Sequence, residues 1–147
     1  MIYLDTSCLV KLLRPEPESP AIFESISLEP RVVISSLAQL ETTIQLKAAY
    51  LAGDYREAQW RTLEAKLEAL LQQVPFEFRA LPGTVFPAAL RQHRNSGKLH
   101  CRSLDRLHLA AMEELGLSRL MTHDDHQAIA ARALRFAVVR PGRACPF

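Results

Sequence analysis

Short apolar runs alternate with longer helical segments along almost the whole chain, and this alternation limits the fold more than any other feature. Strands are predicted at residues 2–4, 32–34, 76–78, 119–122 and 136–139. Helices are predicted at residues 7–13, 20–28, 36–52, 54–73, 85–95, 104–114 and 127–134. Because parallel strands need crossover connections, this order predicts an α/β fold with helices on the faces of a mostly parallel sheet.

Length and composition favour one domain. The chain has 147 residues, of which 48% are hydrophobic, and this is enough to bury a core without disulfides or a structural metal. We expect a single domain over residues 1–141 and a short loose tail over residues 142–147. The net charge of +2 neither requires nor excludes a nucleic-acid partner.

Cysteine usage and hydropathy bear on the compartment. The three cysteines are far apart and lack C-x-x-C spacing, which argues against a disulfide framework and suits reduced thiols. No run approaches the ~20 apolar residues that cross a bilayer, and no signal peptide opens the chain. We therefore expect a cytoplasmic protein without a membrane segment.

Several local signals set the boundaries of the predicted elements. Ser36 with Gln39 three residues later is a capping-box pattern, and Ser103 is a second expected helix cap. Pro75 restricts the strand at residues 76–78 to a sheet edge or a strand start. The helix at residues 54–73 carries one apolar stripe, typical of a core or partner surface, made by Trp60, Leu63, Leu67, Leu70 and Val74.

Four acidic residues occupy related places in this pattern. Asp5 and Asp124 follow predicted strands, whereas Glu41 and Asp105 lie near the starts of predicted helices. Ligands of parallel α/β sheets bind beyond the carboxyl ends of the strands, where all four would meet. Converging carboxylates repel one another, and a divalent cation usually relieves that repulsion. The sequence therefore predicts a divalent-cation site at this edge.

The same segments carry a family resemblance. They read YLDTS at residues 3–7, SLAQLE at 36–41, SLDRLHLA at 103–110 and THDDHQ at 122–127. Each motif is weak alone, but the four in this order resemble the PIN-domain nucleases, especially VapC-like ribonuclease toxins of bacterial toxin–antitoxin pairs. The resemblance covers nearly the whole chain.

What the resemblance implies is specific. It implies a three-layer α/β/α fold, Mg²⁺ or Mn²⁺ as cofactor, endonucleolytic cleavage of RNA, a homodimer and inhibition by a cognate antitoxin. It assigns catalysis and metal binding to Asp5, Glu41, Asp105 and Asp124. Asp125 is the alternative to Asp124, because the two are adjacent and the T-x-D register alone favours Asp124.

Each of these side chains also has an ordinary structural explanation. Asp5 and Asp124 are suited to cap helices, and Asp105 is suited to the positive end of a helix dipole. Glu41 is also explained as a solvated helix residue. The hydroxyls beside the acids either orient ligands and waters or serve turns and caps, and they belong to Thr6, Ser7 and Thr122.

Histidines contribute less to the prediction. His108, one turn after Asp105, is expected to be a packed or hydrogen-bonded helix residue rather than a general base. His123 and His126 with Cys101 have a spacing that fits no common zinc site. Hard oxygen ligands therefore remain the expected donors.

A basic segment lies next to the predicted site. Only one acid, Asp105, interrupts its five cations, which are Arg91, Arg94, Lys98, Arg102 and Arg106. Such a segment either contacts RNA phosphates or forms a solvated helix face, and the sequence does not separate the two.

Other function classes fit less well. A phosphatase of the haloacid-dehalogenase type needs a second Asp two residues after the first, and Ser7 occupies that place. A dinucleotide-binding domain needs G-x-G-x-x-G after the first strand, and none of the five glycines lies there. A catalytically silent PIN-like module that binds RNA or protein stays open, although all four acids are present.

Overall fold

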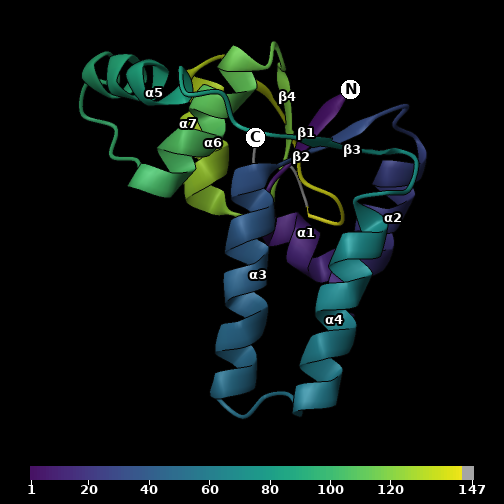
Figure 1. The fold of residues 1–147 in the computed structure, drawn as a ribbon. Coiled ribbons are helices and arrows are strands. Elements are labelled where there is room, and N and C mark those ends of the chain that lie inside the picture. The colour runs from purple at the N-terminus through teal and green to yellow at the C-terminus, as the bar shows by residue number, and fades with distance from the viewer. Residues whose placement is uncertain (144–147) are drawn as a thin grey trace.

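A five-stranded sheet forms the centre of the computed structural model, which describes residues 1–143 (Figure 1). The strands are β1 (Ile2–Leu4), β2 (Val32–Ser35), β3 (Phe76–Arg79), β4 (Arg119–Met121) and β5 (Ala137–Val139). Their order is β3-β2-β1-β4-β5, and every neighbouring pair is parallel. The predicted α/β class is confirmed, and within the described residues the sheet is wholly rather than mostly parallel.

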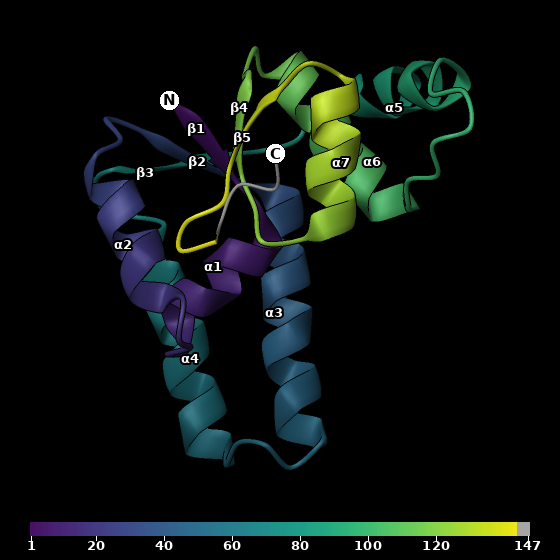
Figure 2. The same ribbon diagram turned by 180° about the vertical axis from the view of Figure 1, so that it is seen from behind.

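The described part of the chain contains seven helices. They are α1 (Thr6–Leu13), α2 (Ser19–Ser27), α3 (Ser36–Leu51), α4 (Glu57–Leu70), α5 (Val85–Arg94), α6 (Ser103–Glu114) and α7 (Asp125–Ala133). Figures 1 and 2 show α5, α6 and α7 on one side of the sheet and α1 and α2 on the other. The helices α3 and α4 run side by side and project from the body as an arm.

Side-chain alternation along the strands builds a separate core on each face. Ile2 and Leu4 of β1 pack into the core that holds α1 to α4, while Tyr3 points into the core that holds α5 to α7. This alternation is the period of two expected for an extended strand. Both faces are apolar because helices cover both, and the three layers of the predicted sandwich result.

Two expected helix caps are shifted by one residue. The side chain that accepts from the first turn of α3 is Ser35, whose Oγ lies 3.1 Å from the Ala38 nitrogen. Ser36 is already helical, and its Oγ accepts from the Leu81 nitrogen instead. Arg102, not Ser103, is the extended residue before α6, and it forms no side-chain cap. A cap residue has an extended backbone, which the residue type alone does not reveal, so the predicted caps Ser36 and Ser103 were wrong by one residue.

The fourth helix is shorter than its sequence suggested. It begins at Glu57 and ends at Leu70, because Arg56 is extended and the chain turns after Leu70. The predicted stripe is buried at Trp60, Leu67 and Leu70, but Val74 is 92% exposed, so its inclusion was wrong. The strand β3 that follows Pro75 is an edge strand, as predicted.

The C-terminal segment lies against the body up to the end of the described residues. Arg143, inside the predicted loose tail, donates to the carbonyl oxygen of His123 at 3.0 Å. Residues 144–147, which complete that predicted tail, lie outside the described residues. Within residues 1–143, none of the helices combines the length and apolar character that a bilayer span would require.

Candidate active site

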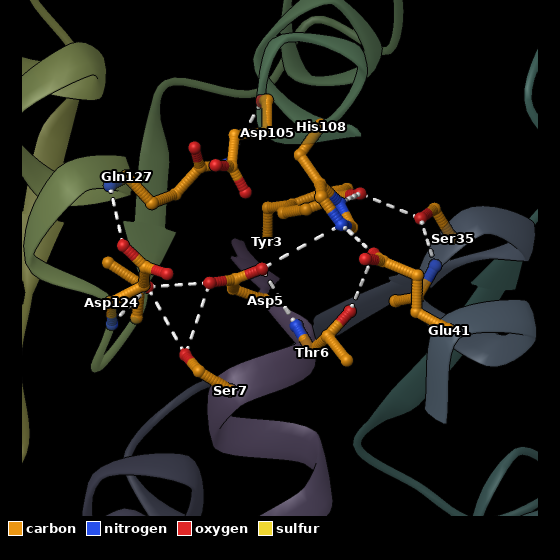
Figure 3. A network of polar contacts seen from close by, with 12 residues as sticks. Tyr3, Asp5, Thr6, Ser7, Ser35, Glu41, Asp105, His108, Asp124 and Gln127 are labelled. Carbon is orange, nitrogen blue, oxygen red and sulfur yellow. Dashed lines mark hydrogen bonds and ion pairs between the residues drawn. The ribbon is translucent and has the colours of Figure 1, made fainter. Parts of the chain in front are cut away.

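All four predicted acids line one cavity of about 460 Å³ beyond the carboxyl ends of the strands. Asp5 follows β1 and Asp124 follows β4, while Glu41 comes from α3 and Asp105 from α6. Figure 3 shows them converging from these four elements. The convergence results from topology, because β1 and β4 are neighbouring parallel strands whose ends share one edge.

Asp5 is the most enclosed of the four. It is 5% exposed and accepts three hydrogen bonds, from the Thr6 nitrogen at 2.8 Å, Ser7 Oγ at 3.1 Å and Thr122 Oγ1 at 2.6 Å. Burial raises the pKa of Asp5, and this effect exceeds the lowering by His108 and the hydroxyls. Asp5 also caps α1, so the structural explanation and membership of the cavity apply together.

A buried polar chain holds Glu41. The hydroxyl of Tyr3 lies 2.7 Å from Ser35 Oγ and 2.6 Å from His108 Nδ1. The other nitrogen of that imidazole, Nε2, forms a hydrogen bond with Glu41 and lies 3.8 Å from Asp5 Oδ1 (Figure 3). His108 is thus the buried, hydrogen-bonded helix residue that its position suggested, and it lies between two acids.

The buried position of His108 between Glu41 and Asp5 shifts the pKa values of His108 and Glu41 in opposite directions. Burial acts to lower the pKa of His108, but the hydrogen bond to Glu41 and the charge of Asp5 raise it overall. For Glu41, burial acts in the opposite direction, and the hydrogen bonds from His108 and Thr6 lower its pKa overall. Thr6 Oγ1 donates to Glu41 Oε1 at 3.0 Å. Each of the three hydroxyls, of Thr6, Ser7 and Thr122, thus donates a hydrogen bond to a carboxylate of the cavity.

The other two acids share a guanidinium. Arg102 Nε donates to Asp105 Oδ2 at 2.6 Å, and Arg102 Nη2 donates to Asp124 Oδ2 at 3.0 Å. The second oxygen of Asp124 caps α7 by accepting from the Gln127 nitrogen at 2.9 Å. Gln127 Nε2 also donates to the carbonyl oxygen of Asp105 at 3.2 Å, which ties α7 to α6.

Asp125, which follows Asp124 in the sequence, does not line the acid cavity. Its side chain is 70% exposed and pairs with Arg140, and this contact lowers the pKa of Asp125. Asp124 lines the cavity, whereas Asp125 is the first residue of α7 and points to the C-terminal segment. The structure therefore places Asp124, and not Asp125, among the converging acids.

The donor set suits a hard divalent cation. Carboxylate oxygens from four elements face one cavity, and Mg²⁺ and Mn²⁺ prefer such oxygen ligands. In their present positions, however, no three His, Cys, Asp or Glu side chains within residues 1–143 are gathered closely enough to hold one ion. The guanidinium of Arg102 lies between Asp105 and Asp124 instead, and the imidazole of His108 lies between Glu41 and Asp5. The residues fit the ion in chemistry, provided that Arg102 withdraws.

The basic segment is not uniform. Arg91 pairs with Glu113, and Arg106 is only 5% exposed. Arg94 and Lys98 are exposed, and Arg102 faces the acids. The five cations therefore differ in exposure and pairing and do not form one exposed surface.

The two histidines and the cysteine considered for zinc form no three-ligand group within residues 1–143. His123 lies 3.1 Å from Lys11 Nζ through Nδ1 and 2.7 Å from the Pro141 oxygen through Nε2. Burial lowers the pKa of His123. Cys101 and His126 line a separate cavity of about 210 Å³.

Sequence reasoning missed three polar residues that support the site: Tyr3, Ser35 and Gln127. A signal existed for Tyr3, because a tyrosine inside an apolar strand needs a partner for its hydroxyl. The roles of Ser35 and Gln127 depend on contacts across elements, which no local pattern reveals.

The comparison with known families decides the relationship. The model of the PIN domain matches residues 2–133. The chain belongs to the PIN-domain family. This PIN domain is 35% identical to "Ribonuclease VapC35" of Mycobacterium tuberculosis, over 98% of this chain and 99% of the relative. It is 34% identical to "Ribonuclease VapC46" of the same species, over 95% of this chain and 97% of the relative.

Solved structures agree on the architecture of this PIN domain. "FitAcB from Neisseria gonorrhoeae" has a TM-score of 0.76 at 20% identity and covers 96% of this chain and 98% of its own. Mycobacterium tuberculosis VapC20, described as a "Sarcin-Ricin loop cleaving toxin", has a TM-score of 0.72 at 17% identity. The match covers 96% of this chain and 100% of the VapC20 chain. At these identities the likeness shows the fold alone.

Proposed function

We propose that this PIN domain is a Mg²⁺- or Mn²⁺-dependent endoribonuclease and the toxin of a toxin–antitoxin pair. The observation that carries the proposal is the single cavity lined by Asp5, Glu41, Asp105 and Asp124. The relatives named as ribonucleases align over nearly the whole chain and support the choice of RNA as substrate.

The four carboxylates would hold the cation. When bound, such an ion supplies charge neutralisation of the phosphodiester and acidification of a water. The chain prepares the ligands: Ser7 and Thr122 fix one oxygen of Asp5, and Thr6 fixes Glu41. Hydrogen bonds of this kind orient ligating carboxylates and limit the movement needed when a ligand binds.

Arg94 and Lys98 are the exposed cations that we assign to RNA phosphates. Phosphate contacts are largely independent of sequence and weaken with salt. Charge reversal of both residues should lower RNA affinity at low salt. Unchanged binding would remove this segment from the interface.

A cognate antitoxin and a second copy of the chain are the proposed protein partners. Their proposed contact is the arm, because α3 exposes large apolar side chains at Leu40, Ile44 and Leu51. Exposed apolar side chains on one projecting helix are typical of a surface that another protein covers. Light scattering of the purified chain should give the mass of a dimer.

Cleavage of RNA by the purified protein tests the proposal. We expect cleavage with Mg²⁺ or Mn²⁺, none with EDTA, and none by Asp5→Asn. Asp125→Asn is the matched control and should stay active, because Asp125 faces Arg140. Cleavage that persists in EDTA, or full activity of Asp5→Asn, contradicts the proposal. RNA binding without any cleavage would instead indicate the silent module.

A further inference from the structure

A second, larger cavity lies between α5 and α6 and opens beside the acids. Its volume is about 760 Å³. Side chains of both helices and of the loop between them line it, among them Phe86, Leu90, His93, His100, Arg106 and Leu107. Arg102 and Ser103 line this groove and the acid cavity alike. The groove therefore lies next to the proposed site of phosphodiester cleavage and shares two lining residues with it.

Arg106 is a buried cation without a full set of partners. It is 5% exposed, and its one hydrogen bond runs from Nη1 to Gln92 Oε1 at 3.5 Å. Within residues 1–143, Nε and Nη2 have no partner and the guanidinium forms no ion pair. Glu113, bonded to Gln92, is already paired with Arg91. A buried charge in this condition is costly unless an anion compensates it.

The outer wall of the groove is apolar and aromatic. Phe86 is 61% exposed and Leu90 is 53% exposed, although both lie on the α5 side of a cavity. An aromatic face, an apolar wall and a guanidinium form the combination that binds a nucleotide of single-stranded RNA, through its base and its phosphate.

We propose that the α5–α6 groove binds the nucleotide next to the scissile phosphodiester, with its base against Phe86 and its phosphate near Arg106. The proposal rests on the ribonuclease function given above. Charge complementarity favours RNA over an apolar protein segment, because Arg106 and Arg102 line the groove and no acid does. Because Arg102 and Ser103 line both cavities, an RNA strand bound at the acids would have its neighbouring nucleotide beside the groove.

Fluorescence anisotropy with a labelled single-stranded RNA oligomer in EDTA tests the groove without cleavage. Phe86→Ala should weaken binding about tenfold, the loss expected for one stacked base. Phe23→Ala is the matched control, since Phe23 is 50% exposed on α2 and outside the groove. Arg106→Gln should weaken binding to a similar degree and reduce its salt dependence. If Arg106→Gln does not fold, the RNA affinity of Phe86→Ala alone tests the inference.

Equal affinity of the wild type and Phe86→Ala for RNA overturns the inference. Loss of a dimer in Phe86→Ala with unchanged RNA affinity also overturns it, because the groove would then be a protein contact. Failure of the proposed ribonuclease function can be distinguished from failure of the groove proposal. Groove-dependent binding by a protein that cleaves no RNA with metal would refute the ribonuclease and keep the groove.

Discussion

Arg102 holds two of the four acids in place of a cation, and its removal should strengthen metal binding. The guanidinium contacts Asp105 Oδ2 at 2.6 Å and Asp124 Oδ2 at 3.0 Å. A divalent ion that uses these oxygens must displace it. Arg102→Ala removes that competition and leaves two like charges facing each other, which a cation relieves.

The expected change in metal affinity follows from the solvent exposure of the three side chains. The side chain of Arg102 is 63% exposed, and those of Asp105 and Asp124 are 16% and 27% exposed. Ion pairs open to solvent contribute about 0.5 kcal/mol each. Loss of both pairs therefore amounts to about 1 kcal/mol, which corresponds to about fivefold tighter metal binding.

Isothermal titration with Mn²⁺, in the absence of RNA, measures the change directly. Arg94→Ala is the matched control, because it removes an exposed cation of the same segment outside the acid cavity. Arg102→Ala should bind Mn²⁺ about fivefold more tightly than Arg94→Ala. Equal or weaker affinity of Arg102→Ala would refute the idea that its guanidinium substitutes for the ion.

Three stability predictions use urea unfolding. Glu29 accepts two hydrogen bonds from Arg119, at 2.8 and 2.7 Å, which lower the pKa of Glu29. Glu29→Gln should cost about 1 kcal/mol at pH 7. The stability that the ionised Glu29 contributes is present above its pKa in the unfolded chain and is lost as the pH falls through its lower pKa in the folded protein. The difference in unfolding free energy between the wild type and Glu29→Gln should therefore shrink at pH 2, and an unchanged difference would contradict the prediction. Leu67→Ala, at a site 1% exposed, should cost ~2–5 kcal/mol, and a loss below 1 kcal/mol would argue against its burial. Tyr3→Phe should cost ~1–3 kcal/mol by leaving His108 Nδ1 without its partner, and a neutral effect would argue against that bond.

The fold was predictable because its signals are local. The β-branched run at Val32 and Val33 marks a strand buried on both faces, and Asp5 ends an apolar run that is too short for a helix. These features alone placed an acid at a strand end. Glu41 and Asp105 were candidates from their places near helix starts, and the family resemblance gave them most of their support, because their own surroundings in the sequence are ordinary helix.

The remaining features depend on contacts between distant segments. Ser35 and Ser36 are equally suited to cap α3, and the choice follows from where β2 stops pairing with β3, at Ser35 opposite Arg79. Charge alone placed Arg106 in a basic segment, and only the packing of α6 against α5 shows that it is buried beside Gln92. No spacing rule in the sequence anticipates either outcome.

Metal binding by two neighbouring variants tests the central claim, that the converging carboxylates form one divalent-cation site. Asp124 lines the cavity and Asp125 pairs with Arg140, although the two are adjacent. Titration with Mn²⁺ should show at least tenfold weaker binding for Asp124→Asn, as for loss of a ligand worth about 1.4 kcal/mol or more, and nearly unchanged binding for Asp125→Asn. Equal affinities of the two variants would contradict the account.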